Sequence, residues 1–159
     1  LACPTGALTH ELNYPHEVKM AVAEVVAPVT CLAVQGKGFK GLARGADFKG
    51  KLRYNEIDRW TPIPISEHPY DLETCDLCVR TCPIEIRYAM CEAGTPPSGE
   101  ERQCPPEHAI RLQPLDDAGT TFLPQILEGC VGCGVCEMIC PVEDPVIVMA
   151  GYPGSGRVL

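Results

Sequence analysis

The sequence lacks a long apolar run and lacks an excess of basic residues. Its longest apolar stretches, such as residues 20–29, are too short and too interrupted to span a bilayer. Lysine and arginine number 13 against 21 aspartate and glutamate residues, which gives a formal net charge of −8. We therefore expect no transmembrane segment in this chain and no general binding to nucleic acid, which is itself a polyanion.

The sequence also lacks the motifs of nucleotide-binding and hydrolytic enzymes. It contains no G-x-G-x-x-G, no P-loop and no nucleophile elbow. The four histidines have no mutual spacing typical of a metal site, and we expect surface or packing roles for His10, His16, His68 and His108. Neither a nucleotide-dependent nor a hydrolytic reaction is indicated.

Cysteine, proline and glycine are what the sequence has in abundance. Eleven cysteines in 159 residues exceed ordinary usage, and an odd number cannot be accounted for by disulfides alone. Sixteen prolines and 15 glycines predict many turns and short elements. The length suits one domain, and we expect residues 1–159 to form it, with insertions at about 37–74 and 84–107.

One complete cluster-binding motif stands at residues 129–141, "GCVGCGVCEMICP". Its cysteines and following proline have the C-x2-C-x2-C-x3-C-P spacing of bacterial [4Fe–4S] proteins: Cys130, Cys133, Cys136, Cys140 and Pro141. Gly132 and Gly134 allow the backbone to approach closely and to adopt positive φ. Zinc prefers separated cysteine pairs, so this spacing favours an iron–sulfur cluster over a zinc site. In two-cluster proteins the fourth cysteine of such a motif ligates the other cluster.

A second motif at residues 73–83, "ETCDLCVRTCP", lacks its first cysteine. Cys75, Cys78 and Cys82 match the last three cysteines, but Leu72 occupies the first position. The remaining candidates for the missing ligand are Cys3, Cys31, Cys91 and Cys104. Of these, Cys31 precedes Cys75 and follows an apolar, strand-like run, as Cys130 does.

Seven segments resemble the NapG/MauM group of ferredoxin-type proteins, and they occur in the same order. They are residues 2–8, 19–26, 31–36, 75–83, 108–112, 122–126 and 130–140. The resemblance implies that Cys31 is the missing first ligand, although residues 32–74 then form a long insertion inside a cluster loop. It also implies that Cys3 is the fourth cysteine of an earlier motif. We therefore interpret the chain as an N-terminally truncated fragment of a polyferredoxin with four motifs.

Two pairings of cysteines with clusters remain open at this stage. In the simple pairing, Cys31, Cys75, Cys78 and Cys140 hold one cluster, while Cys82, Cys130, Cys133 and Cys136 hold the other. In the nested pairing, Cys3 completes the site of Cys31, and the fourth cysteines Cys82 and Cys140 serve clusters outside this chain.

Cys91 and Cys104 lie in a Pro/Gly-rich stretch, residues 88–106, which we interpret as a loop. In an oxidising compartment they could form a disulfide, and the alternative is two free thiols. We favour the disulfide, because the loop otherwise has little to hold it.

The fold class that we predict is α+β, a ferredoxin-like fold for two [4Fe–4S] clusters with pseudo-twofold symmetry. Strands are expected at residues 6–12, 25–29, 109–114, 121–127 and 145–151. Short helices should follow Cys78 and Cys136, and a longer helix is expected at residues 15–24. Apolar side chains should shield the clusters from water, namely Ile110, Leu112, Ile139, Val146 and Ile147.

The function that we predict is one-electron transfer by a carrier that is not itself an enzyme. The resemblance implies a periplasmic or membrane-associated location, and electron flow from a membrane quinol dehydrogenase toward a c-type cytochrome or a reductase. Two alternatives are an iron–sulfur subunit of a larger oxidoreductase and an assembly protein in which the clusters are structural.

Overall fold

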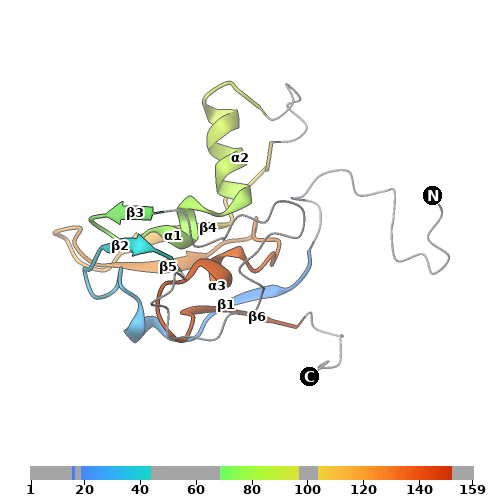
Figure 1. Ribbon diagram of the computed structural model, residues 1–159. Helices are drawn as coiled ribbons and strands as arrows, with labels where there is room; N and C mark the ends of the chain where they lie inside the picture. Colours follow the sequence, from blue (N-terminus) through green and yellow to red (C-terminus); the bar gives the residue numbers. More distant parts are fainter. Residues whose placement is uncertain (1–15, 17–18, 44–68, 97–103, 152–159) are drawn as a thin grey trace.

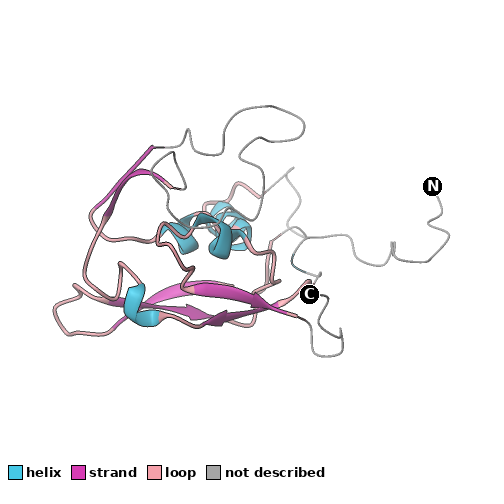
Figure 2. Cartoon of the chain, turned by 60° about the horizontal axis from the view of Figure 1, so that its bottom comes forward, coloured by secondary structure: helices cyan, strands magenta, loops and turns pink. Residues whose placement is uncertain are grey.

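A computed structural model describes residue 16 and residues 19–43, 69–96 and 104–151. Within this part of the chain, six short strands form three two-stranded antiparallel sheets, and three short α-helices connect them (Figure 1). Figure 2 shows the α-helices on one side of a layer of strands. The predicted mixture of helix and sheet is confirmed.

The first and last described strands pair with each other. β1 (Val22–Val25) runs antiparallel to β6 (Ile147–Ala150), with Val25 opposite Ile147. Both Ala23 and Ile147 are buried, so the sheet presents one apolar face to the interior. The pairing joins two segments that are far apart in the sequence.

The second sheet is a hairpin formed by β4 (Ile110–Pro114) and β5 (Phe122–Ile126). Asp116 fixes the connecting turn, because its carboxylate accepts hydrogen bonds of 2.6–3.0 Å from the backbone N–H groups and hydroxyls of Thr120 and Thr121. These hydrogen bonds hold the pKa of the Asp116 carboxyl well below its ordinary value. The strands predicted at residues 109–114, 121–127 and 145–151 are thus confirmed.

The third sheet lies inside the long segment between Cys31 and Cys75. β2 (Phe39–Leu42) pairs with β3 (Pro69–Leu72). Gly38 is required where the two ends of this segment meet, since a Cβ at that position would lie 1.9 Å from the carbonyl oxygen of Leu72. The sheet therefore brings the two ends of the insertion together, while residues 44–68 lie outside the described part.

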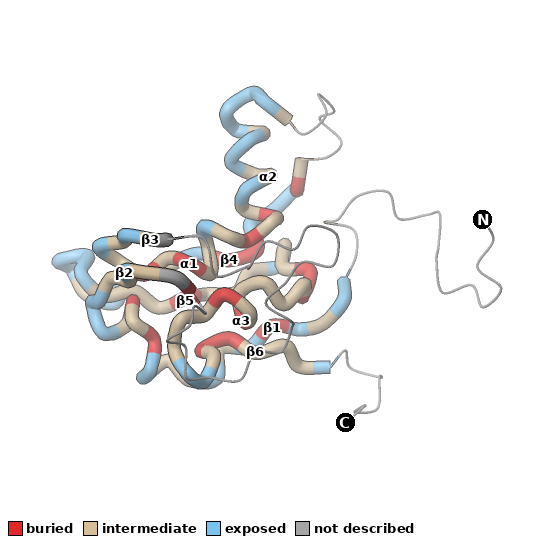
Figure 3. Tube along the Cα trace, viewed as in Figure 1, coloured by how far each residue is buried: buried red, intermediate tan, exposed pale blue. Residues whose placement is uncertain are grey.

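The three α-helices are short, and two of them carry cluster-motif cysteines. α1 (Leu77–Arg80) contains Cys78, and α3 (Val135–Ile139) contains Cys136, so the helices predicted after these cysteines are present but begin one residue before them. α2 (Pro83–Glu92) projects from the body of the fold, and Ile84 is its one buried residue (Figure 3). A disulfide between Cys91 and Cys104, with a Cα–Cα distance of 5.8 Å, ties the end of α2 to the chain that leads into β4.

Three expectations about secondary structure are wrong. The helix expected at residues 15–24 is not formed over its second half, because residues 22–25 pair with β6 and alternate in burial with the period of a strand. The strand expected at residues 25–29 gives way to a 3-10 turn, Pro28–Thr30, that begins at a proline. The stretch 88–106 is not wholly a loop, since α2 extends to Glu92. The strand expected at residues 6–12 lies outside the described residues.

Candidate metal centre

Two cavities in the interior are lined by cysteines, and each receives residues from both halves of the described chain. We name them the Cys31 cavity and the Cys133 cavity. The Cys31 cavity is lined by five cysteines, Cys31, Cys75, Cys78, Cys136 and Cys140. The Cys133 cavity is also lined by five, Cys78, Cys82, Cys130, Cys133 and Cys136.

The Cys31 cavity joins cysteines from distant segments. Cys31 follows the 3-10 turn, Cys75 precedes α1, and Cys140 follows α3. Cys31 and Cys75 are buried, and the remaining wall is apolar. Three of the predicted shielding side chains line this wall, namely Leu112, Val146 and Ile147.

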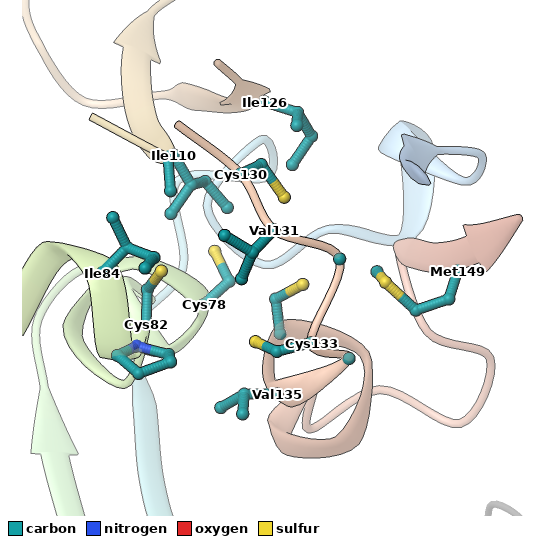
Figure 4. Close-up of a pocket in the computed structure, with 15 residues that line it drawn as sticks. Cys78, Cys82, Ile84, Ile110, Ile126, Cys130, Val131, Cys133, Val135 and Met149 are labelled. Atoms are coloured by element: carbon teal, nitrogen blue, oxygen red, sulfur yellow. The ribbon is translucent and has the colours of Figure 1, made fainter. Parts of the chain in front are cut away.

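The Cys133 cavity is built around the loop that precedes α3. Figure 4 shows Cys78, Cys82, Cys130 and Cys133 arranged around one space, with Ile84 and Ile110 beside them. Ile110 was predicted to shield a cluster and lines this cavity. Ile139, the fifth predicted shield, is buried in the group of core residues that contains Cys75 and Leu77.

Cys78 and Cys136 line both cavities, so their side chains stand in the wall between them. They lie on α1 and α3, which contact each other. One of the two sets that the simple pairing requires lines the Cys31 cavity, where Cys31 and Cys140 lie together. The other set lines the Cys133 cavity, where Cys82 and Cys133 lie together. Cys3, which the nested pairing requires, lies outside the described residues.

The loop of residues 130–134 needs glycine at two positions. Gly132 has φ 69°, and a Cβ there would lie 2.1 Å from the carbonyl oxygen of Ala21, while Gly134 has φ 80°. Lys19 holds the start of the loop, because its Nζ donates to the carbonyl oxygens of Glu128 (2.5 Å) and Cys130 (2.7 Å). The predicted positive φ is present at both glycines, and the predicted close approach of the backbone is present at Gly132.

Burial changes the acidity of the cysteine thiols. Burial, and secondarily the neighbouring thiols, raise the pKa of Cys136 to about 12, and burial raises that of Cys75 to about 11. The pKa values of Cys78 and Cys82 are also raised by burial. The thiolate form that metals require is therefore costly in these cavities unless a bound cation compensates its charge.

The donor set of each cavity fits an iron–sulfur cluster better than a single ion. Among the described residues, no three His, Cys, Asp or Glu side chains converge closely enough to hold one metal ion. A zinc ion would need thiolate sulfurs at about 2.3 Å from one centre. The four cysteines of a [4Fe–4S] site bind four different irons and can stand farther apart. Thiols around an apolar cavity meet that requirement.

The sequence reasoning missed two residues of the site. Lys19 is remote in sequence from the loop that it holds, so no local signal marks it. Glu137 is buried, with 4% of its surface exposed, and its carboxylate accepts a hydrogen bond from the backbone N–H of Met149. Glu137 lies in the middle of the cysteine motif, but nothing in the sequence distinguishes it from an exposed helical glutamate.

Comparisons with known proteins give related sequences but no family profile and no solved structure that matches. The ferredoxin-type protein MauM of methylamine utilization from Paracoccus denitrificans is 26% identical over 98% of this chain and 47% of its own length. The ferredoxin-type protein NapG from Haemophilus influenzae is 24% identical over 92% of this chain and 34% of its own length. A probable pyruvate-flavodoxin oxidoreductase from Escherichia coli is 26% identical over 85% of this chain and 12% of its own length.

The chain therefore spans about half or less of the length of these relatives. The predicted resemblance to NapG/MauM-type ferredoxin-type proteins is confirmed. No helix in the described part of the chain is long and apolar enough to cross a bilayer.

Proposed function

We propose that this chain, a relative of the NapG/MauM ferredoxin-type proteins, transfers single electrons through two [4Fe–4S] clusters. The observation that carries the proposal is the presence of two adjoining cavities, each lined by one complete set of four cysteines. When bound, a [4Fe–4S] cluster takes up and releases one electron. Cys31, Cys75, Cys78 and Cys140 would hold one cluster, and Cys82, Cys130, Cys133 and Cys136 the other.

The protein's own contribution is to bind, shield and separate the two sites. Leu112, Val146 and Ile147 exclude water from one cavity, and Ile84 and Ile110 from the other. The shared wall of Cys78 and Cys136 keeps the sites adjacent, which suits transfer between them. The chain thus acts as a carrier, and no substrate chemistry is assigned to it.

The finer proposal concerns partners and location. The resemblance to NapG and MauM favours electron flow from a membrane quinol dehydrogenase toward a c-type cytochrome or a reductase, on the periplasmic side. The disulfide between Cys91 and Cys104 supports this location, because disulfides persist in oxidising compartments.

A second candidate function is an electron-transfer subunit or domain of a larger oxidoreductase. The observation that favours it is the similarity to a short portion of the probable pyruvate-flavodoxin oxidoreductase. The chemistry of the cavities would be the same, and only the partners would differ.

Anaerobic reconstitution tests the proposal. We expect about eight iron and eight acid-labile sulfide per chain, the content of two [4Fe–4S] clusters, with reversible bleaching of the visible absorption on reduction. Two zinc ions without acid-labile sulfide would overturn the proposal, and clusters that cannot be reduced reversibly would indicate a structural role.

A further inference from the structure

The sheet formed by β1 and β6, which lie side by side in Figure 1, has an inner face that belongs to the core. Side chains alternate between the two sides of a strand, and residues directly opposite each other on paired strands share a side. Ala23 lies opposite Met149, and Val25 lies opposite Ile147. Ala23 and Ile147 are buried, and Val25 and Met149 pack against the same core. These four residues therefore mark the inner face.

The opposite face of this sheet exposes apolar side chains around one carboxylate. Val22 lies opposite Ala150, and Glu24 lies opposite Val148. Val26 extends the alternation beyond β1, because its backbone N–H donates a hydrogen bond of 2.9 Å to the carbonyl oxygen of the residue that precedes β6. Val22 and Val26 are 39% and 51% exposed, and Glu24 is exposed between them. We name these five residues the outer face.

The outer face lies one strand thickness from both cysteine-lined cavities. Along β6, Ile147 lines the Cys31 cavity and Met149 lines the Cys133 cavity. Val148 stands between them in the sequence and belongs to the outer face. Layers that pack face to face are about 10 Å apart, so a protein seated on the outer face would lie close to both candidate cluster sites.

We propose that the outer face is the docking surface for a redox protein whose own surface is apolar and carries basic residues. The inference rests on the proposed function, and it names the kind of partner with which the chain exchanges single electrons. Contact between apolar side chains removes water from such an interface, while opposite charges bring the two proteins together and orient them.

The charges around the outer face select a basic partner. Glu24 stands in its centre, and the exposed acidic residues at 143–144 lie in the segment that leads into β6. The two stretches that contain the sheet, residues 20–36 and 141–151, include no lysine or arginine. Lys19 precedes the first stretch, and its Nζ donates to backbone carbonyls of the cysteine loop. A basic protein is therefore attracted toward this face at low salt.

A second copy of this chain fits the outer face less well than a basic partner does. In a twofold symmetric interface the same surface patch meets itself, so Glu24 of each copy would be buried in an apolar contact near its own counterpart. Like charges in such a position oppose association. The face is also small, whereas a stable interface takes about 800 Å² from each partner. Transient electron-transfer encounters bury less, which suits a face of this size.

The first experiment measures electron transfer to mitochondrial cytochrome c, a basic one-electron acceptor used as the probe. The reconstituted chain is reduced with dithionite, freed of excess reductant and mixed with ferric cytochrome c. In each event the chain loses one electron and the haem iron changes from ferric to ferrous. We expect Glu24→Lys to lower the second-order rate constant about tenfold at an ionic strength of about 0.01 M. The rates of variant and parent should converge at about 1 M, where the Debye length falls to about 3 Å.

Glu92→Lys is the matched control for this charge reversal. It makes the same change in net charge at an exposed position near the end of α2, away from the outer face. The control should slow the reaction only by the smaller effect of net charge. Equal slowing by Glu24→Lys and Glu92→Lys would overturn the proposal.

A second experiment measures binding of ferric cytochrome c to the oxidised chain by titration calorimetry, so it does not depend on electron transfer. Val26→Ser should weaken binding about fivefold at low and at high salt, because it removes apolar contact area. Leu115→Ser is the control, since Leu115 is 53% exposed and lies in the β4–β5 hairpin. Equal effects of these two variants would contradict the proposal. A stable dimer of the parent that Val26→Ser dissociates would assign the face to a second copy and would also overturn it. Absence of acid-labile sulfide from the reconstituted parent would instead refute the proposed function.

Discussion

The backbone N–H of Cys75 donates a hydrogen bond of 3.2 Å to the carbonyl oxygen of Lys37. This contact closes the long segment that follows Cys31, together with the pairing of β2 and β3. Cys31 and Cys75 therefore line one cavity although they are far apart in the sequence. An insertion of this length can be accommodated because its two ends are held together at its base.

Gly38→Ala should open the base of this insertion. A Cβ at Gly38 would collide with the carbonyl oxygens of Leu72 and Glu73, which are backbone atoms and cannot move aside cheaply. We expect the variant to bind about half of the parent's iron after reconstitution, because Cys31 and Cys75 separate. Gly94→Ala is the control, since it tests a glycine with positive φ that has open space around it. Equal iron loss in both variants would contradict this account.

Cys31→Ala should halve the cluster content or leave a labile three-iron species, because we propose Cys31 as the first ligand of the site in the Cys31 cavity. The double variant C91A/C104A should keep the full iron and sulfide content, since these two residues form a disulfide outside both cavities. Its thermal midpoint should fall, because a disulfide closing a short loop contributes roughly 3 kcal/mol. Iron analysis and thermal unfolding measure the two effects. Cluster loss in the double variant would indicate that Cys91 or Cys104 is a cluster ligand, which would contradict the proposed ligand sets.

Cys140→Ala and Cys3→Ala distinguish the two pairings of cysteines with clusters. Cys140 lines the Cys31 cavity, so its removal should damage that site and lower the iron content toward half. Cys3→Ala should leave the iron content unchanged under the simple pairing. The reverse result, with Cys3→Ala losing iron and Cys140→Ala keeping it, would support the nested pairing.

Glu85→Ala should destabilise the junction between α2 and β4. Oε1 of Glu85 accepts hydrogen bonds from the backbone N–H groups of Ala109 (2.6 Å) and Ile110 (3.1 Å), and both residues are buried. Leaving two buried donors unpaired costs about 2–4 kcal/mol in the free energy of unfolding. Thermal unfolding of the loaded protein should show a clearly lower midpoint, whereas Glu92→Ala, at an exposed position near the end of the same helix, should change it little.

Local patterns in the sequence predicted the elements that depend on local interactions. The hairpin strands around residues 109–114 and 121–127 follow from apolar, β-favouring runs separated by a turn, and the short helices at Cys78 and Cys136 from the spacing of the motifs. The wrong helix at residues 15–24 shows the limit of such patterns. An apolar run can suit a helix or a strand, and the partner β6, more than 120 residues later, decided for a strand.

The cysteine spacing by itself predicted the kind of cofactor that we propose, because close-set thiols in the C-x2-C-x2-C-x3-C pattern are typical of iron–sulfur sites. Only the tertiary structure decided which cysteines share a cavity and which acidic residue is buried beside them. Cys31 reaches Cys75 because β2 and β3 bring the ends of the insertion together, and Glu137 is buried because β6 covers α3 and offers it a backbone N–H. Such proximity depends on contacts between residues that are distant along the chain, and local sequence does not encode it.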